Sequence, residues 1–77
     1  MITLTVTKFD AGQDIDSEPA SVKTYKIHGS TLLVAVVNHL TELGMWKPEI
    51  KETVDIMEWS NDGKLYLHQD GITVYSV

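Results

Sequence analysis

The sequence predicts a two-layer α+β domain whose elements follow one another in the order ββαβββ. Apolar and polar residues alternate at both ends of the chain, a central segment repeats apolar residues at helical spacing, and Asp-Gly turn signals divide the C-terminal third. A single helix buries its apolar stripe against one face of a sheet, and two layers follow. The 77 residues are enough for one domain, residues 1–77.

Two strands are expected before the helix. Ile2, Leu4 and Val6 alternate with threonines, which is typical of a half-buried strand and predicts a strand over residues 2–9. Residues 21–27 predict a second strand, which would pair with the first as an antiparallel hairpin. The polar, turn-rich segment between them predicts a long loop over residues 10–19.

The helix is expected over residues 31–43. Ser30 is a suitable N-cap residue, and Gly44 is a suitable C-terminal stop. Four apolar residues share one stripe at helical spacing: Leu32, Val36, Leu40 and Leu43. The stripe predicts the face that packs on the sheet.

The rest of the chain predicts a connection and a three-stranded meander. Lys47 precedes Pro48 and is therefore expected to be non-helical, within a connection over residues 45–52. Asp-Gly pairs predict the two turns. Three strands are expected: residues 53–59, 64–68 and 72–77.

The first half of the chain carries a resemblance to a known family. An opening strand ends in Phe9-Asp10, an acidic loop ends in Glu18-Pro19, a Lys-Thr-Tyr-Lys-Ile strand spans 23–27, and the helix opens Thr-Leu-Leu from Thr31. This pattern resembles the N-terminal domain of the iron-sulfur subunits of succinate dehydrogenase and fumarate reductase. The resemblance implies a β-grasp, ferredoxin-like fold with one helix on a mixed sheet, a [2Fe-2S] cluster, and docking on a flavoprotein subunit.

The cysteine content separates this chain from that family. The family's cluster cysteines follow the helix, whereas this chain contains no cysteine at all. An iron-sulfur cluster needs thiolate ligands. The resemblance therefore implies a fold and a docking habit without redox chemistry, and no cofactor is expected.

Composition and charge narrow the classes of partner. Six lysines and no arginine stand against eleven acidic residues, for a net charge of −5, which disfavours binding to nucleic acid. The longest apolar run, residues 32–37, is far shorter than the ~20 residues of a membrane span. No basic segment precedes an apolar one at the N-terminus, so no signal peptide is expected. We therefore expect a cytoplasmic protein that binds neither nucleic acid nor membrane.

The sequence predicts no catalytic or metal-binding residue. The loop acids lack the glycine and distal glutamate of a calcium loop, and the histidines lie on separate elements without metal-ligand spacing. Ser30 beside His28 lacks any signal for an orienting acid or an oxyanion hole. The residues considered were Asp14, Asp16, Glu18, His28, Ser30, His39 and His68.

A candidate partner-binding surface comes from the helix and the segment after it. The helix is apolar nearly all round, and Val34 and Val37 fall outside the stripe that faces the sheet. Either the segment at 45–52 buries these valines, or they form an exposed patch for a partner. Trp46 is a candidate anchor next to that patch, because tryptophan is enriched at interface hot spots.

These observations favour a non-catalytic protein-binding module, a small accessory or regulatory subunit of a larger complex such as a multi-subunit enzyme. A phage or mobile-element inhibitor that occludes a basic surface of its target is one alternative, because the chain is short and acidic. A degenerate electron-transfer domain or a metal-binding protein is another. The expected partner is another protein, and self-association as a homodimer is also compatible with the sequence.

Overall fold

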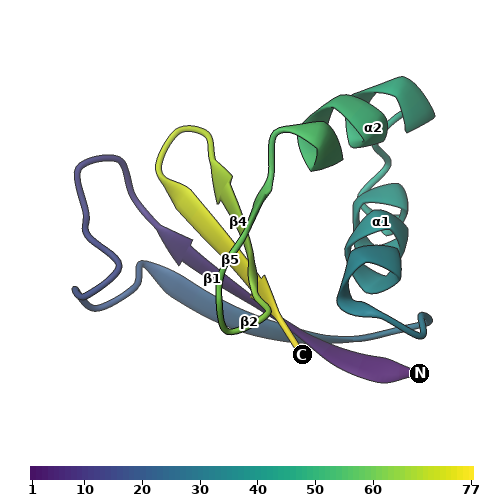
Figure 1. The fold of residues 1–77 in the computed structure, drawn as a ribbon, viewed down its shortest axis with the longest axis horizontal. Coiled ribbons are helices and arrows are strands. Elements are labelled where there is room, and N and C mark those ends of the chain that lie inside the picture. Colours follow the sequence, from purple (N-terminus) through teal and green to yellow (C-terminus); the bar gives the residue numbers. More distant parts are fainter.

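Five strands form one sheet, and two helices lie on one of its faces (Figure 1). The computed structural model describes all residues 1–77. The elements in chain order are β1 Ile2–Phe9, β2 Ser21–Ile27, α1 Leu32–Glu42, α2 Lys47–Asp55, β3 Glu58–Trp59, β4 Leu65–His68 and β5 Ile72–Ser76. The α+β class is confirmed, but the order is ββααβββ. No helix is both long and apolar enough to cross a membrane.

The sheet is antiparallel throughout, with strand order β2-β1-β5-β4-β3. The hairpin of β1 and β2 is confirmed, with Leu4 opposite Tyr25. At the centre, Val6 of β1 lies opposite Tyr75 of β5, and these strands also run in opposite directions. The mixed sheet implied by the resemblance is therefore wrong, and the β-grasp topology is not confirmed. Local alternation indicates which side chains face the core, but it carries no information on the relative direction of distant strands.

Helix α1 begins and ends within one residue of the predicted bounds, with two differences in detail. The N-cap is Thr31 rather than Ser30, and its Oγ1 accepts a hydrogen bond from the Val34 N–H at 3.3 Å. At the other end Gly44 adopts a left-handed φ of 88°, and the Gly44 and Met45 amides donate to the carbonyls of Thr41 and Leu40. This Schellman arrangement satisfies carbonyls that the helix leaves free.

The predicted stripe of α1 is correct for three of its four members. Leu43, the C-cap residue, is exposed. Ala35 and His39 complete the buried face instead. Gly29 allows α1 to approach closely, since a Cβ there would lie 3.0 Å from the Ala35 nitrogen.

The segment predicted as a connection and a long third strand is mostly helix α2. Trp46 is the N-cap and Pro48 lies in the first turn, where its missing N–H costs no helical hydrogen bond. Ile50 is buried and Val54 is half-buried, four residues apart on one helical face. The third strand is therefore reduced to Glu58–Trp59, and the prediction that Lys47 lies outside a helix is wrong.

The C-terminal meander is confirmed. Strand β4 pairs with both β3 and β5, and its turn to β5 places Asp70 and Gly71 at positive φ angles of 50° and 115°. A Cβ on Gly71 would collide with the carbonyl oxygen of Phe9. Glycine is thus required there both by the backbone angle and by the close approach to the end of β1.

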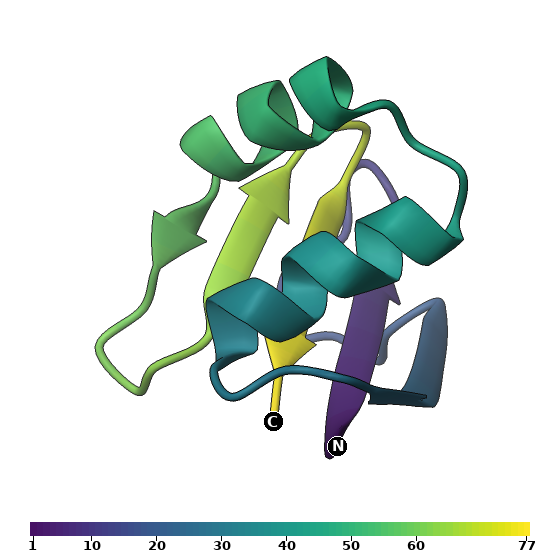
Figure 2. The ribbon, with the colours of Figure 1, turned by 90° about the vertical axis from the view of Figure 1, so that its right-hand side faces the viewer.

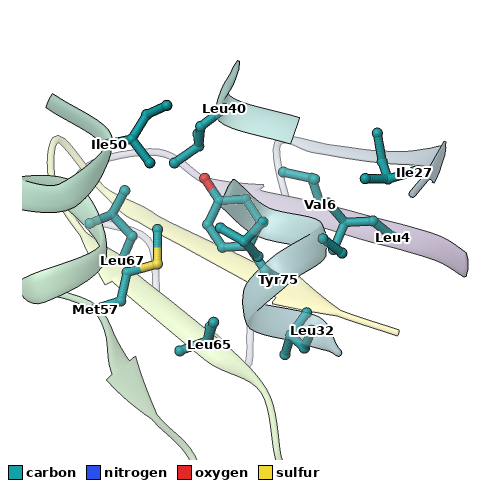
Figure 3. Packing of buried hydrophobic residues seen from close by; sticks show 12 residues of the cluster. Leu4, Val6, Ile27, Leu32, Leu40, Ile50, Met57, Leu65, Leu67 and Tyr75 are labelled. Carbon is teal, nitrogen blue, oxygen red and sulfur yellow. The ribbon is translucent and has the colours of Figure 1, made fainter. Parts of the chain in front are cut away.

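The two faces of the sheet are covered differently. Even-numbered residues of β1, such as Leu4 and Val6, face the helices and join a core of twelve buried residues (Figure 3). Phe9 and Val74 are also buried but lie outside that cluster, since they alternate with core residues. Ile15 lines a small cavity together with them, so the loop between β1 and β2 covers part of the second face.

Candidate functional site

The structure separates the three residues predicted to bind a partner. Trp46 is 73% exposed at the start of α2, and Val34 is 42% exposed on α1. Val37 is half-buried and packs against the core cluster. It also lines an open groove of about 510 Å³ between α1 and α2, which neither Val34 nor Trp46 lines. Whether these residues bind a partner stays a prediction, but they do not line one common groove.

The two candidate valines of the apolar helix differ in burial, since Val37 is half-buried and Val34 is exposed. Helix α2 runs beside α1 above the sheet (Figure 2), and its Ile50 and Val54 line the same groove as Val37. Val37 is therefore covered in part by the segment that follows residue 45. Val34 lies one turn earlier on α1, does not line that groove and is exposed.

A larger groove, of about 590 Å³, opens on the face of the sheet opposite the helices. It lies between the β1–β2 loop and the hairpin of β3 and β4. Figure 1 shows the β1–β2 loop at the end of the sheet away from the helices. The lining residues of the groove are Gln13, Asp14, Ile15, Glu58, Trp59, Ser60, Asn61, Tyr66, His68 and Ile72. This volume lies within the range of about 300–1,000 Å³ that is usual for ligand pockets.

Strand alternation supplies the floor of this far-face groove. Along β4, Tyr66 and His68 alternate with Leu65 and Leu67, which are buried in the core. Tyr66 and His68 therefore point away from the helices. The Tyr66 and His68 rings lie nearly parallel, with an interplanar angle of 19° and centroids 6.4 Å apart. The floor thus presents flat aromatic surface.

The short strand β3 forms one wall. Glu58 lies directly opposite Tyr66 in the sheet, so these two share the far face. Trp59 lies opposite Leu65 at the edge of the sheet, with 57% of its surface exposed. Exposed aromatic side chains beside a groove are typical of binding surfaces, where tryptophan and tyrosine are enriched.

Hydrogen bonds within the β1–β2 loop hold the opposite wall. The Asp10 amide donates to Gln13 Oε1 at 2.7 Å, and Gln13 Nε2 donates to the Glu18 carbonyl at 3.0 Å. The Ser17 amide donates to the Asp14 carbonyl at 3.0 Å. These bonds fix the turn that carries Asp14 and Ile15 to the groove.

The charge along the groove is negative. Two carboxylates, Asp14 and Glu58, line it, and no lysine does. Asp62 lies on the adjoining turn, where a hydrogen bond from the Ser60 hydroxyl lowers the pKa of its carboxyl. Lys64 lies 3.7 Å from Asp62, and both side chains are exposed.

The histidines and loop acids stay apart. No three of the acidic and histidine side chains gather closely enough to hold a metal ion. His28 lies between β2 and α1, and His68 lines the far-face groove. His39 is buried at 5% exposure, with its ring centroid 4.5 Å from Tyr25 and 6.5 Å from Tyr75. Burial lowers the pKa of His39, so the neutral imidazole is the favoured form within the core.

The far-face groove was not predicted from the sequence. Its residues come from the loop, β3, β4 and β5, and only the folded chain brings them together. The alternation in β4 was a usable signal for the side of the sheet on which Tyr66 and His68 lie.

Comparison of the chain with protein-family models, with curated proteins and with solved structures found no match.

Proposed function

We propose that this protein is a non-catalytic protein-binding module, a small accessory or regulatory subunit that contacts its partner through the far-face groove. The observation that carries the proposal is the meeting of exposed aromatic surface with a pre-formed groove. Tyr66 and His68 form the floor of this groove on the far face of the sheet, Glu58 lies opposite Tyr66 on the same face, and the exposed Trp59 lines the groove at the sheet edge.

The size of the open surface supports a macromolecular partner. Ile15 lines one wall and Trp59 the other, and both are exposed, so apolar contact area is available on both walls. The hydrogen-bonded loop and the paired strands provide both walls before any partner binds. Pre-formed walls reduce the ordering cost of association.

The acidic surroundings indicate the charge of the partner. Asp14 and Glu58 line the groove, and the loop over residues 10–19 carries four carboxylates and no lysine. A basic patch on another protein complements such a surface and is steered towards it. The same feature favours an inhibitor that occludes a basic surface as one form of this module.

Site-specific photo-crosslinking in the native host tests the proposal. A benzoylphenylalanine replaces Trp59 in one variant and Trp46 in a matched second variant, so that each exposed tryptophan position reports on its own surface. We expect one defined crosslinked protein from the position of Trp59 and none from the position of Trp46.

Two outcomes would contradict the proposal. A crosslinked partner from the position of Trp46 alone would move the interface to the helix side, where Val34 and Trp46 are exposed. The absence of a defined product from either position, with both variants folded by circular dichroism, would remove the evidence for a protein partner.

A further inference from the structure

We propose that the far-face groove recognises an arginine side chain presented by a basic segment of the partner protein. The inference rests on the proposed function and adds to it the chemical group that the groove selects. It follows from three features of the groove: its charge, its flat aromatic surfaces and its shape.

The negative charge of the groove favours a cationic side chain as its ligand. The groove is lined by the carboxylates of Asp14 and Glu58 without a lysine to neutralise them. The only ion pair in the structure joins Lys64 to Asp62 at the neighbouring turn, so it leaves both groove carboxylates free. A cationic side chain entering the groove would gain charge-assisted hydrogen bonds that a neutral one could not make.

The aromatic surfaces favour arginine over lysine. The near-parallel rings of Tyr66 and His68 offer flat faces, and the exposed Trp59 also lines the groove at the edge of the sheet. A guanidinium is planar and weakly hydrated, so it stacks on an aromatic face while its edge N–H groups remain available to carboxylates. An ammonium is more strongly hydrated and has no flat face, so it gains less from the same surface.

The shape favours a side chain from a protein over a free amino acid. The groove is open and extends from the loop at Gln13 to Ile72 at the start of β5. An extended segment can lie along it with one side chain directed at the floor. The carboxylate of a free amino acid would be repelled by Asp14 and Glu58, whereas a peptide backbone carries no such charge.

The test is an NMR titration of the isotope-labelled full chain with three blocked pentapeptides of sequence Gly-Gly-X-Gly-Gly. The central residue X is arginine, lysine or citrulline, the neutral analogue of arginine. We expect the arginine peptide to shift the Trp59 indole N–H and the Tyr66 and His68 amides. The citrulline peptide should bind about tenfold more weakly, since it loses both the cation–π and the charge-assisted contacts.

Matched variants locate the binding. Glu58→Gln and Trp59→Ala should each weaken the arginine peptide by about tenfold, because each removes one part of the recognition. Glu52→Gln and Trp46→Ala, which change exposed residues on or next to α2, should leave the affinity unchanged. Glu58→Gln keeps the size of the side chain, so it remains informative if Trp59→Ala loosens strand β3.

Three results would overturn the inference. Equal binding of the citrulline and arginine peptides would show that charge is not recognised. Binding that survives in Glu58→Gln and Trp59→Ala would place the site elsewhere, and tighter binding of free arginine than of the blocked peptide would indicate a small-molecule site. If a partner is crosslinked from the position of Trp59 and any of these results is also found, the proposed function is supported and only the recognition of arginine is contradicted.

Discussion

The buried histidine of α1 predicts a loss of stability in mild acid that a single substitution should abolish. His39 is 5% exposed, and burial lowers its pKa below the ordinary 6.5. Glu42 opposes this shift and Lys8 adds to it, but burial is the largest cause. In the unfolded chain the imidazole regains its ordinary pKa. Below pH 6.5 the unfolded state therefore binds a proton that the folded state does not.

The sign and the size of the effect follow from proton linkage. The free energy of unfolding should fall as the pH is lowered from 6.5 towards the folded-state pKa of His39. One proton of difference gives a slope of at most about 1.4 kcal/mol per pH unit. Asp62 also has a lowered pKa, but the stability linked to its carboxyl begins to be lost only near its ordinary 3.8, far below the pH of 6.5 at which the loss linked to His39 begins.

The variant His39→Phe removes the titrating group while it keeps a ring between Tyr25 and Tyr75. Urea unfolding followed by far-UV circular dichroism, repeated from about pH 5 to about pH 8, measures the slope for each protein across the range in which histidine titrates. We expect the slope of the native chain to be largely lost in His39→Phe and kept in His28→Phe, since His28 is exposed. Equal slopes in the native chain and in His39→Phe would refute the reasoning.

Three further predictions concern stability and can be checked by thermal or urea unfolding. Gly71→Ala should destabilise the fold by at least about 1–3 kcal/mol, because the new methyl group meets the end of β1 at a left-handed φ; an unchanged melting temperature would contradict the backbone there. Leu65→Ala should lower the free energy of unfolding by about 2–5 kcal/mol, whereas Leu43→Ala should change it by no more than about 0.5 kcal/mol. Similar losses in both variants would contradict the assignment of Leu65 to the core and of Leu43 to the surface. Val37→Asp should unfold or strongly destabilise the domain while Val34→Asp remains folded, and the opposite order would reverse the assignment of the two α1 valines.

The parts of the fold that the sequence predicted are those in which one local pattern had one structural meaning. Strand β1 alternates cleanly because only one face of it packs on the helices, and the bounds of α1 followed from its cap residues and its apolar repeat. Helix α2 was missed because its segment also alternates, as in Val54 and Ile56, and because Pro48 was interpreted as a helix breaker. In the first turn of a helix, proline is tolerated.

The candidate site was less predictable for a physical reason. The far-face groove exists only where the β1–β2 loop meets the β3–β4 hairpin, and no spacing along the chain encodes that meeting. Trp46 was favoured as an anchor because it lies in the segment that follows the apolar helix and because tryptophan is enriched at interface hot spots. Trp59, placed by the short strand β3 at the wall of a groove, could be recognised only from the folded chain.

The pairing of β1 with β5 has a consequence for how the chain folds. It is the only seam between the β1–β2 hairpin and the β3–β4–β5 meander, and it joins Thr5 to Ser76, so that the two ends of the chain lie close together (Figure 2). The hairpin and the meander can each begin locally, but a two-stranded hairpin is marginal alone, and closing the seam requires almost the whole chain to be brought together. We therefore expect the seam to form late and to limit the folding rate. A circular permutant that links the two ends and opens the chain after Gly44 would turn this seam into a local hairpin and should fold faster while it keeps the same native sheet.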